Sequence, residues 1–195
     1  RFPLIVKSTI EDASMGISQA SVVESDEKLA ERVKFVHELC GTPAIAEQYI
    51  DGREIYVGVL GNERLKALPV WELQFEKLTP GTLPIATERV KRNIRHQERI
   101  GLAQGPATDL SNGQGNRIRE AAKRICRVLD LDGYCRIDFR LGRDGVPYFI
   151  EANPNPEIAR SEEFAQSAAH DGVPYPELIS RILALAIART GGEAE

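Results

Sequence analysis

The fold is decided by residues 134–153, which read YCRIDFRLGRDGVPYFIEAN. Two runs of alternating apolar residues flank Asp144-Gly145, a strong signal for a two-residue hairpin turn. The stretch therefore predicts two antiparallel strands, over residues 133–141 and 146–152. One face of this hairpin is apolar and suited to a core, and it carries Cys135, Ile137, Phe139, Ile150 and Ala152.

The other face of the predicted hairpin is polar. A turn at that position sets Asp138 directly opposite Glu151 and Arg136 opposite Asn153, all on one face because side chains alternate along a strand. A bulge would shift this register. Two carboxylates about 5 Å apart raise one pKa or recruit a cation, and carboxylate and amide oxygens suit Mg²⁺. The residues alone leave two alternatives open, a solvated polar face on which Arg136 pairs the carboxylates and a glycoside-hydrolase pair.

Outward from the hairpin, hydrophobic periodicity predicts an α+β organisation with antiparallel sheets. Strands are predicted over residues 3–7, 20–23, 44–50, 53–60 and 64–70. Helices are predicted from an N-cap at Ser25 to a stop at Gly41, and over residues 115–129, 161–169 and 175–189. Asp51-Gly52 is predicted to be a two-residue turn between its flanking strands. Residues 71–112, with three prolines and three glycines, predict a long functional or mobile loop.

The length of the chain allows one sizeable domain or two lobes. We expect a first lobe over residues 1–62, a second lobe over residues 63–189 and a flexible tail over residues 190–195. The sequence begins at Arg1, without a methionine, and runs at once into a core strand. We therefore expect a fragment from which an upstream domain is absent.

Composition narrows the classes of function. The 195 residues carry a net charge of −4, which argues against nucleic acid or an anionic membrane as a partner. No apolar run approaches the roughly 20 residues of a membrane span. The three widely spaced cysteines match neither a disulfide framework nor a zinc site, so we expect a reducing, cytoplasmic location.

A second functional pattern lies near the start of the chain. Lys7 ends an apolar strand and is followed by a loop of small polar residues that includes Ser14 and Gly16. Backbone N–H groups, hydroxyls and a lysine can together surround phosphates. The order of residues in a Walker A motif is missing, and an ordinary surface loop is the alternative.

Taken in order, four segments resemble the ATP-grasp superfamily. They are LIVK at residues 4–7, SMGI at 14–17, EQYIDGRE at 47–54, and RIDF with YFIEANP across the hairpin. Within the superfamily the chain most resembles the D-alanine–D-alanine ligase branch, and the match extends from about residue 3 to about residue 187. The resemblance implies an ATP-grasp fold, with two lobes of antiparallel sheets flanked by helices that grip ATP between them.

The resemblance also implies how ATP is bound. Lys7 would contact the α- and β-phosphates, and the loop Ser14, Met15 and Gly16 would cover them. Glu47 would accept from the adenine amino group. Gln48, Tyr49 and Ile50 would complete adenine recognition, largely through the backbone. Glu54 would hold the ribose hydroxyls.

For metal binding and chemistry, the resemblance implies a second set of residues. Asp138, Glu151 and Asn153 would bind two Mg²⁺ ions, with Mn²⁺ as a substitute. Arg136 would stabilise the transferring phosphate. Lys91 would contact the γ-phosphate, with a solvated run of charges as the alternative for this residue.

The implied activity is an ATP-dependent carboxylate–amine ligase that works through an acylphosphate on small-molecule carboxylate and amine substrates. The alternative is a non-catalytic or regulatory Mg-ATP-binding module, suggested by Asp12 and Ala13 in the phosphate loop and by Glu157; a purely structural domain is a third hypothesis. Glu157 would repel an amino-acid carboxylate, whereas Arg160 and Ser161 could hold one. D-alanine and an amine with a positive group therefore both stay open as substrates, as does a homodimer. Without an upstream domain we expect weak Mg-ATP binding and no complete ligation.

Overall fold

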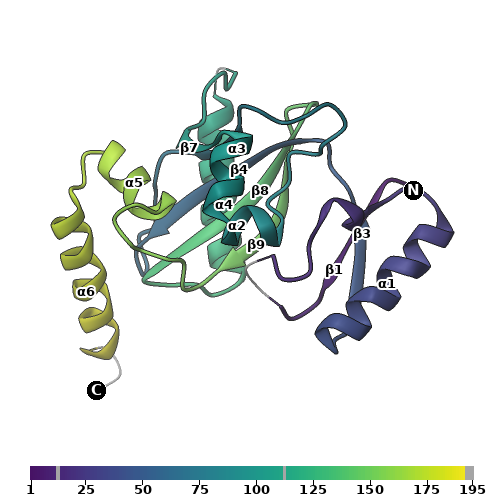
Figure 1. Cartoon of the computed structure of the whole chain (residues 1–195). Helices are drawn as coiled ribbons and strands as arrows, with labels where there is room; N and C mark the ends of the chain where they lie inside the picture. Colours follow the sequence, from purple (N-terminus) through teal and green to yellow (C-terminus); the bar gives the residue numbers. More distant parts are fainter. Residues whose placement is uncertain (12–13, 112, 192–195) are drawn as a thin grey trace. The chain divides into compact units, whose positions relative to one another are not determined.

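The computed structural model describes residues 1–11, 14–111 and 113–191 (Figure 1). Its contacts divide the chain into two compact units. Unit 1 comprises residues 1–51 and 75–103, and unit 2 comprises residues 52–74 and 104–195. Asp12 and Ala13, on which part of the regulatory alternative rests, lie outside the described residues.

The N-terminal part of unit 1 is a three-stranded antiparallel sheet with a helix packed on it (Figure 1). The strand order is β2 (Val22–Val23), β1 (Leu4–Ser8), β3 (Ala44–Gln48), and the short 3₁₀ helix η1 (Gln19–Ser21) precedes β2. Helix α1 (Asp26–Cys40) begins as predicted, because the Ser25 side chain accepts from the Lys28 N–H, and it ends at Gly41 with φ of 67°. Its Val36 packs with Val6 and Val23 in a small core.

The segment predicted to be a long loop contains regular structure instead. It holds β6 (Trp71–Phe75), α2 (Glu88–Arg92), α3 (Ile94–Ile100) and β7 (Leu102–Pro106). Thr87 and Asn93 cap the two helices through their side-chain oxygens. Helices of five and seven residues are too short to show a hydrophobic period, which is why periodicity missed them.

Most of a six-stranded antiparallel sheet lies in unit 2. Its order is β7, β6, β4 (Gly52–Leu60), β8 (Tyr134–Gly142), β9 (Pro147–Asn153), with β5 (Lys66–Ala67) also paired to β4. The predicted hairpin at Asp51-Gly52 is wrong, because β3 pairs with β1 whereas β4 pairs along its whole length with β8. That pairing also puts residues 52–60 in unit 2, although the sequence placed them in the first lobe.

The hairpin of β8 and β9 confirms the predicted pairing at its polar end. Arg136 is opposite Asn153 and Asp138 is opposite Glu151. The turn is longer than predicted, because the Gly142 N–H donates to Val146 O at 2.9 Å and three residues lie between them. A bulge after Asp138, where the register shifts so that one residue of β9 is extra, offsets the longer turn.

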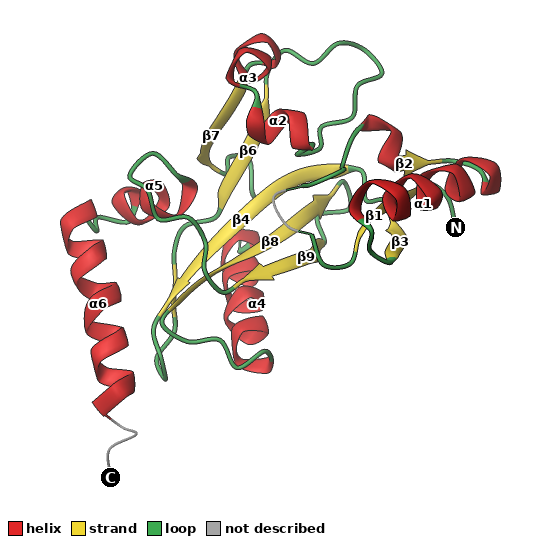
Figure 2. Cartoon of the chain, turned by 60° about the horizontal axis from the view of Figure 1, so that its bottom comes forward, coloured by secondary structure: helices red, strands yellow, loops and turns green. Residues whose placement is uncertain are grey.

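Helices cover the sheet of unit 2 (Figure 2). Helix α4 (Gln114–Val128) buries Ile118, Ala122 and Cys126 against β4 and β8. Helices α5 (Glu163–His170) and α6 (Tyr175–Gly191) form a second core with the end of β4. Helix α6 takes in residues 190 and 191 of the expected tail, and residues 192–195 lie outside the described part. Among the described residues, no helix has the length and hydropathy needed to cross a bilayer.

Candidate functional site

In unit 1, the predicted phosphate lysine and the predicted adenine glutamate contact each other. Lys7 lies opposite Ile45 on the paired strand, so Glu47, two residues further along, projects from the same face. The Lys7 Nζ lies 2.6 Å from Glu47 Oε2, and both side chains are partly exposed. The pair is therefore accessible to a ligand that would separate the two charges.

The backbone of the predicted phosphate loop, described from residue 14 to residue 17, turns sharply at Ser14 and Gly16. Both have positive φ, 60° and 71°, and the Ile17 N–H donates to Ser14 O at 2.9 Å. A Cβ on residue 16 would meet only ordinary contacts, so backbone conformation rather than space favours glycine there. Met15 lies half-buried between them.

Two charged side chains hold the Gly16 peptide from its two sides. The Gly16 N–H donates to Glu88 Oε2 at 2.9 Å. The buried Arg32 donates to the Gly16 carbonyl and, at 2.8 Å, to Ser21 Oγ. Burial lowers the pKa of Arg32, but the guanidinium keeps its positive charge at neutral pH. The loop is therefore fixed by one anion and one cation of this chain.

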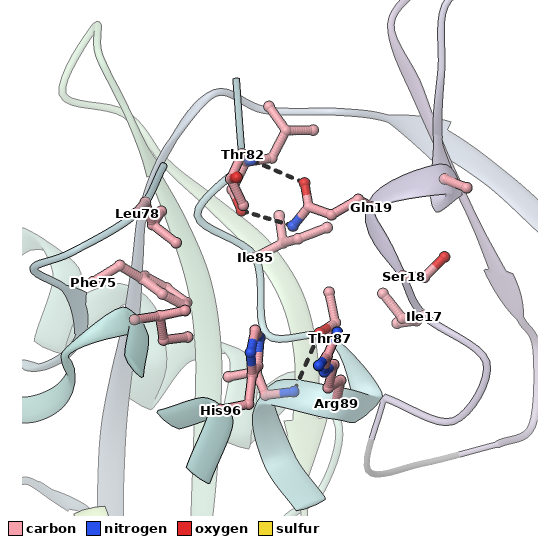
Figure 3. Close-up of a pocket in the computed structure, with 14 residues that line it drawn as sticks. Ile17, Ser18, Gln19, Phe75, Leu78, Thr82, Ile85, Thr87, Arg89 and His96 are labelled. Carbon is pink, nitrogen blue, oxygen red and sulfur yellow. Dashed lines mark hydrogen bonds between the residues drawn. The ribbon is translucent and has the colours of Figure 1, made fainter. Parts of the chain in front are cut away.

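The residues that follow the loop line a cavity of about 320 Å³ within unit 1 (Figure 3). Its apolar wall includes Phe75 and Ile85, and Arg89 and His96 lie close together at one side. Gln19 ties the loop to the opposite wall, since its Nε2 donates to Leu83 O at 3.0 Å and its Oε1 accepts from Leu83 N at 2.9 Å. The phosphate loop is thus anchored to residues 82–90 of the same unit.

The remaining predicted residues of unit 1 lie at the end of β3 and on α2. Gln48 is exposed, whereas Tyr49 is buried and donates its N–H to Pro3 O at 3.0 Å. Ile50 is half-buried. Lys91 is exposed on α2, and its Nζ has no ion pair among the described residues.

In unit 2, the polar face of the hairpin is buried on one strand only, because Arg136 and Asp138 of β8 are buried whereas Glu151 of β9 is exposed and Asn153 is half-buried. The Arg136 side chain makes a two-pronged contact with Asp138, with Nε to Oδ1 at 2.7 Å and Nη2 to Oδ2 at 2.8 Å. Its Nη1 donates to Glu163 on α5, and its guanidinium lies 4.9 Å from the ring centroid of Tyr56. Burial opposes the charge of Arg136, but Asp138 and Glu163 outweigh it and raise the pKa of the guanidinium.

The predicted ribose ligand lies further along the same face. Glu54 Oε1 accepts from the Tyr56 hydroxyl at 2.7 Å, and Glu54 Oε2 lies 3.6 Å from Arg140 Nη1. Burial, together with the negative charges of Glu54 and Asp138, raises the pKa of Tyr56 well above its ordinary value. Tyr56 is therefore a neutral hydrogen-bond donor at any physiological pH.

The donor set on the hairpin fits Mg²⁺. Asp138 and Glu151 supply two carboxylates from paired positions, and Asn153 supplies an amide oxygen from the same face. Asn153 Oδ1 also accepts from the Asn155 N–H at 3.0 Å, which uses one of its two lone pairs. Within the described ranges, no three His, Cys, Asp or Glu side chains cluster as a metal site. Mg²⁺ commonly takes only one or two protein carboxylates, so the smaller set suffices.

Four residues at these sites were missed by sequence reasoning. They are Arg32, Tyr56, Glu88 and Glu163. Tyr56 could have been found, because strand alternation puts it on the face of Glu54. Glu88 and Glu163 lie 72 and 27 positions from their partners, and no local pattern signals such contacts.

The fold with two sheets and a charged hairpin defines an ATP-grasp chain, and comparisons with known proteins agree. A family model described as D-ala D-ala ligase C-terminus matches residues 1–184. The structure resembles a crystal structure of the D-alanine–D-alanine ligase from Bacillus anthracis complexed with ATP, with a TM-score of 0.76, 21% identity, and coverage of 99% of this chain and 55% of that one. The chain belongs to the D-ala D-ala ligase C-terminus family.

Relatives in sequence agree with this assignment. The chain is 33% identical over 188 residues to a D-alanine–D-alanine ligase of Geobacillus kaustophilus, covering 96% of this chain and 47% of the relative. It is 30% identical over 195 residues to the uncharacterized protein y4sG of Sinorhizobium fredii, covering 98% of this chain and 54% of that protein. The chain thus spans about half the length of the relatives it matches.

Proposed function

We propose that this chain is the ATP-grasp portion of an ATP- and Mg²⁺-dependent ligase that joins a carboxylate to an amine. The observation that carries the proposal is the strand pairing that sets Asp138 opposite Glu151 and Arg136 opposite Asn153 on one face. The family of the chain supports it, because relatives of similar sequence are named D-alanine–D-alanine ligases. Lys7, the Ser14–Gly16 loop, Glu47 to Ile50 and Glu54 would bind the nucleotide.

In the proposed reaction the substrate carboxylate attacks the γ-phosphorus of ATP, and ADP leaves. The amine then attacks the acyl carbon of the acylphosphate, and inorganic phosphate leaves as the amide forms. Lys7 would neutralise phosphate charge after leaving Glu47, and Lys91 is free to reach the γ-phosphate. Arg136 would face the developing negative charge, held in place by Asp138 and Glu163.

Asp138, Glu151 and Asn153 would hold Mg²⁺, which neutralises the phosphates and orients them for transfer. Two ions are the proposed number, and Mn²⁺ would be accepted by the same oxygen donors. The chain itself contributes the strand pairing that holds these three oxygen donors on one face of the hairpin. Arg136 limits the excess negative charge of this face before a metal binds.

The amine substrate would enter an acidic environment. Glu157 and Glu163 both interact with Glu162, and burial together with these two charges raises the pKa of Glu162. Arg160, stacked 4.9 Å from the ring centroid of Tyr175, is one nearby cation. Arg136 already compensates Glu163, which leaves the carboxylates of Glu157 and Glu162 in excess. This surplus of carboxylates favours an amine with a positive group, and Arg160 with Ser161 would hold a D-amino acid carboxylate if D-alanine is the substrate.

A Mg-ATP-binding module without turnover is the second candidate. It is favoured by the saturation of Arg136, whose guanidinium already contacts two carboxylates and a ring. Such a module would bind Mg-ATP and release no phosphate with any acid and amine. The two candidates therefore differ in turnover and agree in binding.

Titration calorimetry with Mg-ATP and an assay of phosphate release test the two candidate functions. We expect binding that weakens at least about tenfold in Asp138→Asn, because the substitution removes a charged metal ligand. Asp132→Asn, an exposed residue of the same unit, is the matched control and should leave the affinity unchanged. An affinity for Mg-ATP that is unchanged in Asp138→Asn would contradict the proposed metal site. Phosphate release stimulated by an acid and an amine would exclude the module without turnover.

A further inference from the structure

The Glu88 carboxylate is bound to a backbone N–H group that a phosphate of ATP is expected to use. The Gly16 N–H lies in the phosphate loop and is the donor that ATP would engage under the proposed function, on which this inference rests. In the structure that N–H donates to the Glu88 carboxylate at 2.9 Å. A carboxylate on a loop amide presents the same chemistry as a phosphate oxygen, an anionic acceptor of N–H groups.

We propose that Glu88 is an internal competitor of ATP, which must leave Gly16 before the phosphates bind there. The two cannot share the amide, because it has one hydrogen to donate and the two acceptors are both negative. The apparent affinity for ATP is then lowered by the fraction of molecules in which Glu88 holds the amide.

The loop is built so that Glu88 can leave without the loop collapsing. Arg32 still holds the Gly16 carbonyl, and Gln19 still makes its two bonds to the backbone of Leu83. The Glu88 N–H donates to Ile17 O at 3.0 Å, so the start of α2 stays beside the loop when the side chain rotates away.

Arg92 can hold the Glu88 carboxylate after a phosphate has displaced it from Gly16. Glu88 Oε1 already lies 3.2 Å from Arg92 Nη1, one helical turn on, and about a third of the Glu88 side chain is exposed. Lys91 lies on the same turn of α2. Displacement of Glu88 by a phosphate therefore removes a negative charge from the loop and leaves the cations of α2 near it.

Substitution of Glu88 should therefore strengthen the binding of Mg-ATP rather than weaken it. Glu88→Ala removes the competitor, and Glu88→Gln replaces it with a neutral and weaker acceptor of similar shape. Both variants should bind Mg-ATP more tightly than the unmodified protein, by about three- to tenfold. A side chain that merely supports the loop would give the opposite sign, because its loss would loosen the binding site.

The experiment is titration calorimetry of Mg-ATP and of magnesium tripolyphosphate into the full chain and three variants, Glu88→Ala, Glu88→Gln and Glu98→Gln. Glu98 is exposed in the same segment, so Glu98→Gln removes an equal charge away from the loop. Hydrogen exchange at the Gly16 amide is the second readout. Without nucleotide it should be faster in Glu88→Ala than in the unmodified protein, and with ATP bound it should be equally slow in both.

Each outcome decides the proposal. Tighter binding by both Glu88 variants, with Glu98→Gln unchanged, supports it. Equal or weaker binding by the Glu88 variants overturns the proposal while the proposed function stands. An equal gain in affinity in Glu98→Gln also overturns it, because the tighter binding would then come from the change in net charge. If none of the four proteins binds ATP or tripolyphosphate, the proposed function fails and the competitor role fails with it.

Discussion

At the scale of single residues, the candidate site of unit 2 depends on buried charges that compensate each other. Arg136 and Asp138 are both more than nine-tenths buried, and each would be costly to bury alone. Glu163 and the ring of Tyr56 complete the surroundings of the guanidinium. The arrangement holds Arg136 in one orientation, which its proposed role beside a reacting phosphate would require.

Tyr56 gives this buried face a measurable pH dependence. Its raised pKa means that the folded protein keeps the hydroxyl neutral, so its contribution to stability is complete below the unfolded pKa of about 10. As the pH rises above that value, the unfolded chain ionises and the contribution falls by about 1.4 kcal/mol per pH unit.

Tyr56→Phe isolates the effect, because it keeps the ring and removes the ionisable group. Near pH 8 we expect the unmodified protein to be more stable by about 1–2 kcal/mol, the value of the hydrogen bond to Glu54. Near pH 11 this difference should shrink by about 1.4 kcal/mol. Urea unfolding of both proteins at the two pH values measures it, and a difference that does not change with pH would contradict the buried, neutral hydroxyl.

At the scale of elements, the hairpin depends on its turn as much as on its strands. Gly145 has φ of 76°, and a Cβ there would lie 3.0 Å from Gln114 Nε2. That nitrogen donates to Gly145 O at 2.8 Å and ties the turn to the first turn of α4. The turn thus sets the register that, together with the bulge, places Asp138 opposite Glu151.

Gly145→Ala should therefore lower the free energy of unfolding by about 1–2 kcal/mol, through backbone strain and disturbance of the Gln114 contact. Gly105→Ala is the control, because Gly105 has open space around its Cβ position and its φ is not positive. It should stay within about 0.5 kcal/mol of the unmodified protein. Equal losses in the two variants, measured by urea unfolding, would show that the turn has no special role.

The elements also show what a sequence can predict. The caps of α1 at Ser25 and Gly41 and the pairing across the hairpin were predictable, because each depends on residues close together in the chain. The separation of β3 from β4 was not, because a turn signal does not say which strand is the neighbour. The contacts of Glu88 and Glu163 join distant segments, and periodicity carries no information about them.

At the scale of the whole molecule, the chain has separate cores of unequal size. Unit 1 contains a small one built on Val6, Val23 and Val36. Unit 2 contains a larger one, in which Val57 and Ile137 of the six-stranded sheet pack against α4. Since buried apolar area supplies most of the stability, we propose that the two units are separate folding domains and that unit 1 unfolds first.

Reciprocal substitutions test this division. Val36→Ala leaves a cavity in the core of unit 1, and we expect a loss of about 2–3 kcal/mol. Hydrogen exchange should then speed up in β1 and β3 while β8 stays protected. Val57→Ala, the matched change in unit 2, should expose β8 to exchange with little further effect on β1. Equal acceleration in both units for either variant would mean that the chain unfolds as one cooperative body, and the proposed separation of the two domains would be wrong.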